Sequence, residues 1–151
     1  PNNLSINIIS LTGIETIDEL YQKIFTLFDY IAEKLQQKKE AKHEDIILKV
    51  LDIINREYSN QLLSVDFIAD NLCFSPTYLG RLFKKHTSKS ILDFINEARI
   101  NNSKRLLTST ELSIAEIAFM SGFTSSIYFH KVFKKSNGVT PKDFRIIKKK
   151  S

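Results

Sequence analysis

The second half of the chain contains an internal repeat, and this repeat constrains the fold more than any other feature of the sequence. Residues Val65–Ala69 are similar to Ile114–Ala118, and Phe74 matches Phe123 at the same offset. Further along, Tyr78–Lys85 matches Tyr128–Lys135 at an offset that is one residue longer. Two copies of one supersecondary unit rarely arise by chance. The sequence therefore predicts one small structural unit that is used twice.

Each copy, residues 64–87 and residues 113–136, has the pattern of a helix, a tight turn and a second helix. In the first copy, Ser75-Pro76 marks the start of the second helix, because serine is a good N-cap and proline suits the first helical position. In the second copy, Ser113 and Glu116 have the spacing of a capping box, which starts a helix. Gly122 lets the chain reverse sharply. The pattern predicts a helix-turn-helix motif in each copy.

The rest of the chain also favours helices, so the predicted fold class is all-α. The chain has only 4 Gly and 3 Pro, too few for a β fold with many loops. A long linker helix is expected over 90–108, after an N-cap at Ser90. At ~1.5 Å per residue it would be about 27 Å long, close to the ~34 Å of one DNA turn. Residues 45–151 are therefore predicted to form one domain of two helix-turn-helix subdomains on a linker helix.

Residues 1–44 are expected to form a helical extension before this domain. An amphipathic helix is predicted over 16–39, because Ile17, Ile24 and Ile31 fall on one heptad position. The apolar stripe fits two arrangements. One is a packed amphipathic helix, and the other is a two-stranded coiled coil that makes a homodimer through residues 16–39.

Two other segments near the N-terminus have weaker patterns. The polar stretch 36–44 is predicted to be a joint, followed by a second helix over 45–58 with apolar residues at helical spacing. Residues 1–11 alternate weakly between apolar and polar types and remain ambiguous.

Basic residues gather on the second helix of each copy. The net charge is +5 and the isoelectric point about 9.3, which favours an anionic partner. Helical spacing turns phenylalanine and leucine inward, and the phenylalanines are predicted to be core residues. The same spacing turns another set of residues outward. In the first copy these are Thr77, Gly80, Arg81 and Lys84, and in the second copy they are Ile127, His130, Lys131 and Lys134, with Ser125 and Ser126 at the helix start. A basic outer face is what a helix needs to enter a groove of double-stranded DNA.

Two other classes of function fit the sequence less well. A helix-turn-helix that binds protein would need an apolar or acidic outer face. An enzyme would need an acid–base or nucleophile constellation, and none is visible. His43, His86 and His130 lack metal-ligand spacing, so no metal and no cofactor is expected. His130 contacts either DNA or solvent.

These motifs together identify a resemblance: residues 45–147 are similar to the DNA-binding domain of the AraC/XylS family of bacterial transcription regulators. The first recognition helix is represented by Tyr78–Lys85 and the linker helix by Arg99-Ile100 with Leu106-Leu107. The signature half is represented by Ile114–Phe123, Tyr128–Lys135 and Thr140–Arg145.

The resemblance implies seven helices, no enzymatic activity, promoter binding and usually activation, with RNA polymerase as a candidate partner. The base-reading positions that it implies are Thr77, Gly80, Arg81, Ser126, Ile127, His130 and Lys131. Arg81 and Lys131 are expected to carry most of the readout. Phosphate contacts are expected from Ser75, Lys84, Lys85, Ser125, Lys134, Lys135 and Arg145. Three residues depart from the usual family pattern: Gly80 in place of a polar residue, Ser88 in place of glycine, and Phe144 in place of tyrosine.

The single cysteine, Cys73, excludes an internal disulfide and suits a reducing cytoplasm. It is predicted to be a buried turn residue, because it lies in an apolar run. No signal peptide and no apolar run of spanning length is visible, so no membrane contact is expected. The chain starts with Pro1 rather than Met and is interpreted as part of a longer protein.

Overall fold

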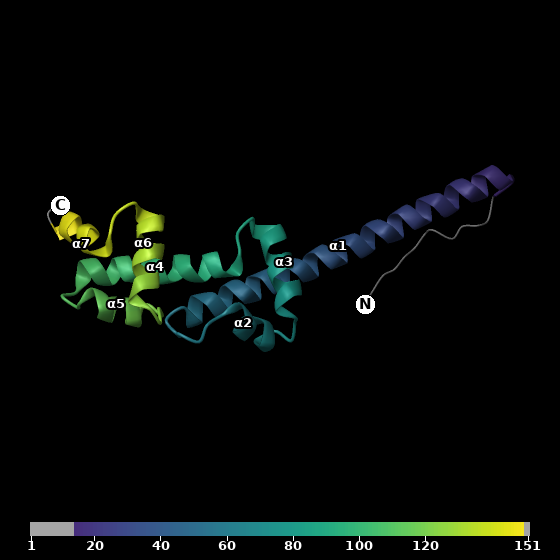
Figure 1. Cartoon of the computed structure of the whole chain (residues 1–151). Coiled ribbons are helices and arrows are strands. Elements are labelled where there is room, and N and C mark those ends of the chain that lie inside the picture. The colour runs from purple at the N-terminus through teal and green to yellow at the C-terminus, as the bar shows by residue number, and fades with distance from the viewer. Residues whose placement is uncertain (1–13, 150–151) are drawn as a thin grey trace. The chain divides into compact units, whose positions relative to one another are not determined.

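The computed structural model describes residues 14–149, and in this range the chain forms helices and no strand (Figure 1). The helices are α1 (Ile17–Glu57), α2 (Val65–Asn71), α3 (Pro76–Thr87), α4 (Ile91–Ser109), α5 (Ile114–Met120), α6 (Ser126–Asn137) and α7 (Pro141–Lys149). The all-α fold class and both helix-turn-helix motifs are confirmed, as α2–α3 and α5–α6. The ambiguous residues 1–11 lie outside the described range.

The predicted joint at 36–44 is wrong, because α1 is one continuous helix of 41 residues. The stretch is polar but holds neither glycine nor proline, and its glutamine, lysine, glutamate and alanine are strong helix formers. Side chains one turn apart also support one another. Gln36 Nε2 donates to Glu40 Oε1 at 2.6 Å, and Gln37 Nε2 donates to Glu33 Oε1 at 3.0 Å. Polarity without a stop signal does not end a helix.

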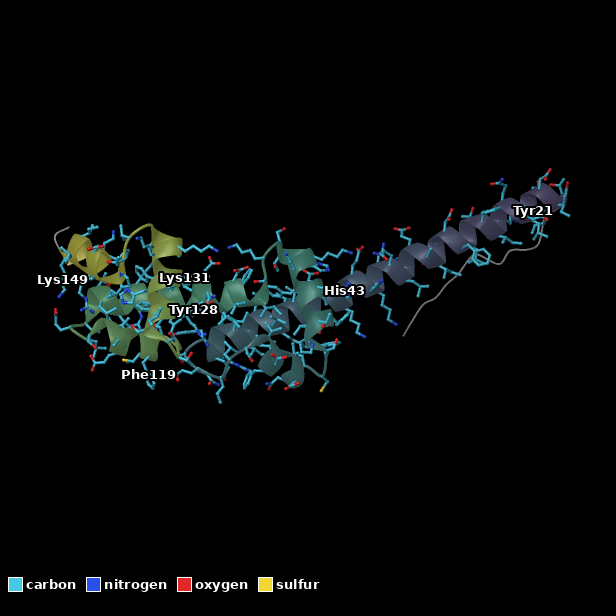
Figure 2. All side chains as sticks on the ribbon, viewed as in Figure 1. Tyr21, His43, Phe119, Tyr128, Lys131 and Lys149 are labelled. Atoms are coloured by element: carbon cyan, nitrogen blue, oxygen red, sulfur yellow. The ribbon has the colours of Figure 1, made fainter. Side chains whose placement is uncertain are left out.

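The chain divides into two compact units, residues 1–45 and residues 46–151. In the described part of the first unit, the apolar stripe of α1 is open to solvent. Its exposed members include Ile17, Tyr21, Ile24, Phe25, Phe28, Ile31 and Leu35, and Tyr21 is marked in Figure 2. These residues have no hydrophobic core of their own within the unit.

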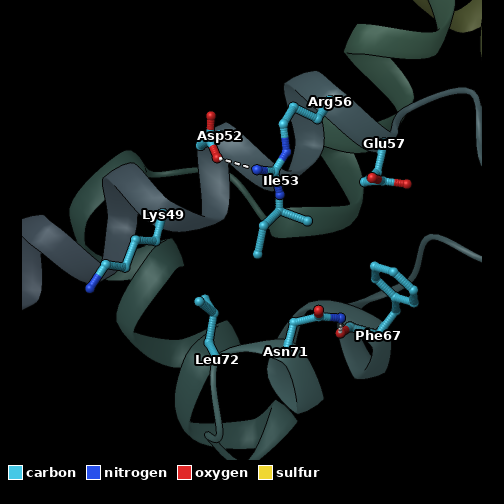
Figure 3. A pocket seen from close by; sticks show the side chains of 8 residues that line it. All are labelled: Lys49, Asp52, Ile53, Arg56, Glu57, Phe67, Asn71 and Leu72. Atoms are coloured by element: carbon cyan, nitrogen blue, oxygen red, sulfur yellow. Dashed lines mark hydrogen bonds and ion pairs between the residues drawn. The ribbon is translucent and has the colours of Figure 1, made fainter.

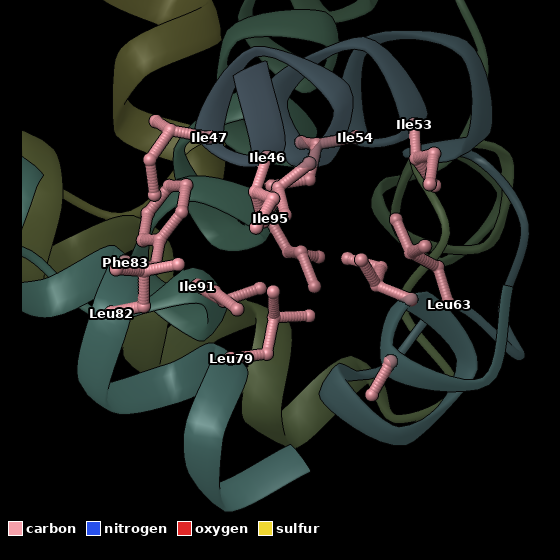
Figure 4. Packing of buried hydrophobic residues seen from close by; sticks show 13 residues of the cluster. Ile46, Ile47, Ile53, Ile54, Leu63, Leu79, Leu82, Phe83, Ile91 and Ile95 are labelled. Carbon is pink, nitrogen blue, oxygen red and sulfur yellow. The ribbon is translucent and has the colours of Figure 1, made fainter. Parts of the chain in front are cut away.

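The second unit has two separate hydrophobic clusters, one for each helix-turn-helix copy. The first cluster joins the C-terminal part of α1 to α2, α3 and the start of α4 (Figure 4). Its buried residues are Ile46, Ile47, Val50, Ile53, Ile54, Leu63, Ile68, Ala69, Leu79, Leu82, Phe83, Ile91 and Ile95. The second cluster joins the rest of α4 to α5 and α6, with Phe144 of α7 packed against it. Its buried residues are Ile100, Leu106, Leu107, Ile117, Ala118, Phe123, Phe129 and Phe133.

Aromatic rings fill the second cluster. Phe133 lies between Phe129 and Phe144, with ring centroids 5.6 and 5.5 Å away. The prediction that the phenylalanines are core residues is therefore right for these positions, but wrong for Phe119, which is 66% exposed on α5, and for Phe25 and Phe28 of α1.

Serine side chains cap most helices of the second unit, and the caps predicted at Ser75, Ser90 and Ser113 are confirmed. Ser75 and Ser125 each accept a hydrogen bond from a backbone N–H at the start of α3 and α6. At the start of α4, the amide and hydroxyl of Ser90 both donate to the Asp93 carboxylate. These hydrogen bonds lower the pKa of Asp93 below its usual value, because they stabilise the ionised form.

Cys73 is exposed, which contradicts its predicted burial. The residue forms the turn between α2 and α3 and has a left-handed backbone with φ of 58°. Its neighbours Leu72 and Phe74 are half-buried. The apolar run was therefore a poor guide to burial at the one residue where the chain reverses.

None of the helices in the described range is apolar over a stretch long enough to span a lipid bilayer.

Candidate nucleic-acid interface

The second helices of the two copies, α3 and α6, are held in the same way. Each packs an apolar face on its own cluster, through Leu79, Leu82 and Phe83 in α3 and through Phe129 and Phe133 in α6. In Figure 1 the two helices run in nearly the same direction. The helix α6 crosses α4, whereas α3 lies beside the loop that leads into α4. Burial of one face fixes which side chains each helix presents outward.

The outer faces of α3 and α6 carry the predicted base-reading residues. Thr77 and Arg81 on α3 are exposed, and so are Ser126, Ile127, His130 and Lys131 on α6. Ile127 is the most open of the large apolar residues of this unit, with 84% of its surface exposed. Gly80 is half-buried, but a Cβ added there would meet no atom within 4 Å. A side chain at position 80 would therefore have room, and the glycine is not required by packing.

Positive charge is concentrated on both helices in the same pattern. Arg81, Lys84 and Lys85 of α3 occupy the positions that Lys131, Lys134 and Lys135 occupy in α6, and all six are exposed. Neither helix contains an aspartate or glutamate. Ser75 and Ser125, the predicted phosphate contacts at the helix starts, are exposed N-caps. Each copy thus presents a cationic helix whose start can accept an anion.

Arg145 differs from the other predicted phosphate contacts. It is half-buried on α7. Its Nε donates to the Leu107 carbonyl at 3.3 Å, and its Nη2 donates to the Leu112 carbonyl at 2.6 Å. These bonds tie α7 to the end of α4 and to the loop before α5. We do not assign Arg145 to the phosphate contacts, because its guanidinium is engaged by the protein itself.

A groove of about 580 Å³ lies between α4 and α6, and Asn96, Tyr128 and Lys131 are among the residues that line it. Asn96 Nδ2 donates to the Tyr128 hydroxyl at 3.0 Å; Tyr128 and Lys131 are both marked in Figure 2. Sequence reasoning missed this contact, because it joins two residues of different helices without a local pattern. A smaller hollow of about 290 Å³ lies between α1 and α2 and is lined by none of the predicted site residues (Figure 3).

Comparison with known proteins places this arrangement in a family. The helix-turn-helix domain family matches residues 68–146. The Msm operon regulatory protein of Streptococcus mutans is 32% identical over 136 residues, which cover 90% of this chain and 49% of that protein. The C-terminal domain of AraT, a response regulator from Geobacillus stearothermophilus, superposes with a TM-score of 0.65 at 33% identity, over 68% of this chain and 84% of that one.

The chain belongs to the AraC/XylS family.

Other relatives agree with this assignment. The arabinose operon regulatory protein of Salmonella typhimurium is 29% identical over 129 residues, which cover 85% of this chain and 44% of that protein. Members of the AraC/XylS family are DNA-binding transcription regulators and not enzymes, in agreement with the sequence prediction. The chain spans about half, or less, of the length of these curated relatives.

The structure shows the surroundings of two departures from the family pattern. Ser88 caps α3 with a left-handed backbone, φ 62°, where the family commonly has glycine. Phe144 packs its ring against Phe133 in the second cluster, so a hydroxyl group is not required for that contact.

Proposed function

We propose that the chain binds double-stranded DNA sequence-specifically by inserting α3 and α6 into successive major grooves on one face of the duplex. The observation that supports this most is the repeated outer face, in which α3 and α6 each carry three exposed cations and no acid. The helix that joins them, α4, has 19 residues, which gives a length of about 28 Å. Both helices pack on α4, which holds them on one scaffold; successive major grooves on one face of a duplex are ~34 Å apart.

The exposed residues divide into two roles in this proposal. Arg81 and Lys131 read bases, because their side chains can donate two hydrogen bonds to guanine in the major groove. Thr77, Ser126, Ile127 and His130 flank them, and Gly80 leaves space. The phosphate contacts come from Ser75, Lys84, Lys85, Ser125, Lys134 and Lys135, which set the position of each helix without reading sequence.

The test begins with selection of bound duplexes from a random pool, which defines the two half-sites. Half a turn, about 5 bp, is then inserted between them. If both helices dock, the insertion turns one half-site to the far side of the duplex and affinity falls sharply. The control is the same insertion outside the two half-sites, which should leave affinity unchanged. Equal affinity for both duplexes would mean that only one helix docks. No enrichment of any duplex would favour the protein-binding alternative.

We further propose that the bound protein activates transcription by contacting RNA polymerase, in the cytoplasm on the bacterial nucleoid. The curated relatives are named operon regulatory proteins, which supports regulation but leaves its sign to experiment. Transcription in vitro from a promoter that carries the selected site should rise when the protein is added. It should not rise with Lys131→Ala. A fall in transcription would contradict the activator role.

The exposed stripe on α1 supports a homodimer through residues 16–39. Isoleucine on one heptad position and leucine on another favour a two-stranded coiled coil. Sedimentation should give a dimer, and Ile24→Lys with Ile31→Lys should give a monomer. Gln22→Lys with Thr26→Lys is the matched control, since each lies two positions from Ile24, about 200° around the helix. A monomeric parent at high micromolar concentration would contradict the proposal.

A further inference from the structure

Arg99 lies in the middle of α4 and is only 7% exposed. Its guanidinium donates to three backbone carbonyls of the loop that precedes the first helix-turn-helix copy. Nε donates to Tyr58 O at 2.9 Å, and Nη2 donates to Asn60 O at 2.9 Å and to Leu63 O at 3.4 Å. Burial lowers the pKa of Arg99, but a guanidinium remains protonated in proteins. These are therefore charge-assisted hydrogen bonds, roughly twice as strong as neutral ones.

The turn of the second copy reaches the same point. Gly122 has a left-handed backbone with φ of 90°, and a Cβ added there would lie 2.2 Å from Tyr58 O and 2.8 Å from Arg99 Nε. The next residue, Phe123, places its ring 5.7 Å from the Arg99 guanidinium carbon. Three parts of the second unit thus meet at one buried cation: the loop before the first copy, the middle of α4, and the turn of the second copy.

We propose that Arg99 and Gly122 together fix the placement of the first copy relative to the second, and thereby the half-site spacing that the protein accepts. The inference rests on the proposed function, in which α3 and α6 dock together. The two hydrophobic clusters share no residue, and α4 contributes Ile91 and Ile95 to one and Ile100, Leu106 and Leu107 to the other. The contact at Arg99 lies at the boundary between these two sets.

Arg145 supplies a natural control for this role. Its Nε and Nη2 donate to Leu107 O and Leu112 O, which are the positions in the repeat that match Tyr58 and Leu63. Each arginine therefore holds two equivalent carbonyls in the segment before its copy. The hydrogen bonds of Arg145, however, reach only the end of α4 and the loop before α5. Arg145 therefore makes the same kind of hydrogen bonds as Arg99 but does not connect the two copies.

The first experiment measures affinity for duplexes in which the selected half-sites are moved apart or together by one and two base pairs. Each base pair rotates one half-site by about 34–36° around the duplex. The parent and Arg145→Met should lose about tenfold or more per base pair, equivalent to about 1.4 kcal/mol per tenfold change. Arg99→Met should bind the best spacing less tightly and show a much flatter profile. Arg99→Lys should be intermediate, because an ammonium lacks the planar fork that reaches several carbonyls.

The second experiment needs no DNA, so its failure can be told apart from failure of the proposed function. Spin labels are attached to the exposed Cys73 in the first copy and to the exposed position 136 on α6 after Ser136→Cys, which is not on the helix that Arg145 holds. The distance distribution between the labels should be narrow in the parent and in Arg145→Met, and broad in Arg99→Met. An unchanged distribution in folded Arg99→Met, or an unchanged spacing profile, would overturn the inference.

If Arg99→Met does not fold, a pair of glycine variants provides the test instead. Gly122→Ala and Gly138→Ala both put a side chain on a left-handed backbone, φ 90° and 74°, but only position 122 faces a neighbour, since nothing lies within 4 Å of a Cβ at 138. Gly122→Ala should displace the loop at Tyr58 and shift the distance between the labels. Gly138→Ala should leave it unchanged. The same distribution in both variants would contradict the role assigned to Gly122.

Discussion

The two helix-turn-helix copies require the left-handed backbone at the same two points and meet the requirement with different residues. The turn uses Cys73 in the first copy, φ 58°, and Gly122 in the second, φ 90°. The residue that ends the second helix is Ser88, φ 62°, after the first copy, and Gly138, φ 74°, after the second. A left-handed residue other than glycine costs of order 1–3 kcal/mol. The first copy therefore carries a strain that the second copy avoids.

What surrounds each turn explains part of this difference. The side chain of Cys73 is exposed, so only the backbone conformation opposes it. At Gly122 a side chain would meet Tyr58 O at 2.2 Å, so packing as well as conformation requires glycine. The repeat fixes the path of the backbone, whereas the residue that a position tolerates depends on which neighbouring segment lies against it.

The outer faces of α3 and α6 differ in a complementary way. The lysine pairs match position by position, Lys84-Lys85 with Lys134-Lys135, whereas Gly80 stands opposite His130 in the repeat. Phosphate contacts position a helix on DNA and base contacts specify the sequence. The common lysines agree with a common way of docking, and the different neighbours lead us to expect two half-sites of different sequence.

The largest effect is expected from the phenylalanines at equivalent positions in the two cores. Phe83 and Phe133 are both fully buried, in separate clusters. Phe83→Ala and Phe133→Ala should each cost about 3–5 kcal/mol of the free energy of unfolding, because each leaves a cavity. Denaturant unfolding measures the loss. Ile127→Ala, on a side chain that is 84% exposed, should stay within about 0.5 kcal/mol of the parent.

Unfolding of these variants also tests how independent the copies are. A single transition in both variants would mean that the clusters unfold together, coupled through α4 and the Arg99 contact. Two transitions, with only the mutated copy shifted, would show that the copies unfold separately. A loss below about 1 kcal/mol at either position would contradict its role in the core, because truncation of a buried phenylalanine is among the costly core changes.

A smaller and more selective effect is expected on DNA binding. Arg81→Ala should weaken binding by ~1–3 kcal/mol and relax discrimination at one base pair of the first half-site. Lys131→Ala should do the same at the second half-site. Stability should change by no more than about 0.5 kcal/mol, since both side chains are exposed. Affinity for each single-base variant of the selected site is the measurement.

The pattern of losses decides which role each residue has. If Arg81→Ala weakened binding to every sequence equally, Arg81 would contact phosphate and not a base. Lys84→Ala is the matched control on the same helix, and it should give that uniform loss together with a weaker dependence on salt. Identical profiles for Arg81→Ala and Lys131→Ala on the same half-site would contradict the assignment of one helix to each half-site.

Local patterns predicted those parts of the fold that local physics determines. The serine caps at Ser75 and Ser90, the capping box at Ser113, and the apolar faces of α3 and α6 all follow from residues within a few positions of each other. The repeat then placed the outer faces correctly, because burial of Phe83 or Phe133 leaves the opposite face to solvent. The same reasoning failed at 36–44, where a polar composition was mistaken for a helix end.

The parts that could not be predicted depend on contacts between distant segments. Arg99 belongs to a family motif, but nothing near it in sequence indicates that it binds carbonyls of residues 58–63. The sequence predicted Arg145 to be a phosphate contact because it is basic, but its guanidinium binds the carbonyls of Leu107 and Leu112. Phe119 is exposed although it follows a helical apolar pattern. Periodicity gives the face of a helix, but not whether another element covers that face.

The smallest effect is expected from exchanging the residues that end α3 and α6. Ser88 and Gly138 accept the same geometry: the backbone N–H of each donates to a carbonyl four residues earlier, Lys84 O at 2.9 Å and Lys134 O at 2.8 Å. Ser88→Gly should stabilise the protein by up to about 1 kcal/mol, because relief of the left-handed strain exceeds the entropy that glycine adds to the unfolded chain.

Gly138→Ser should lower stability by a similar amount, and through the backbone alone, since nothing lies within 4 Å of a Cβ at this position. Both variants are compared with the parent by denaturant unfolding, and the double exchange should return stability close to that of the parent, as distant sites are usually additive. DNA affinity and the preferred half-site spacing should not change, because neither residue takes part in the contact of Arg99 with Tyr58, Asn60 and Leu63. If Ser88→Gly were destabilising, the serine side chain would be making a favourable interaction at the cap. That interaction would outweigh the left-handed strain, and the first copy would not be the more strained of the two at this position.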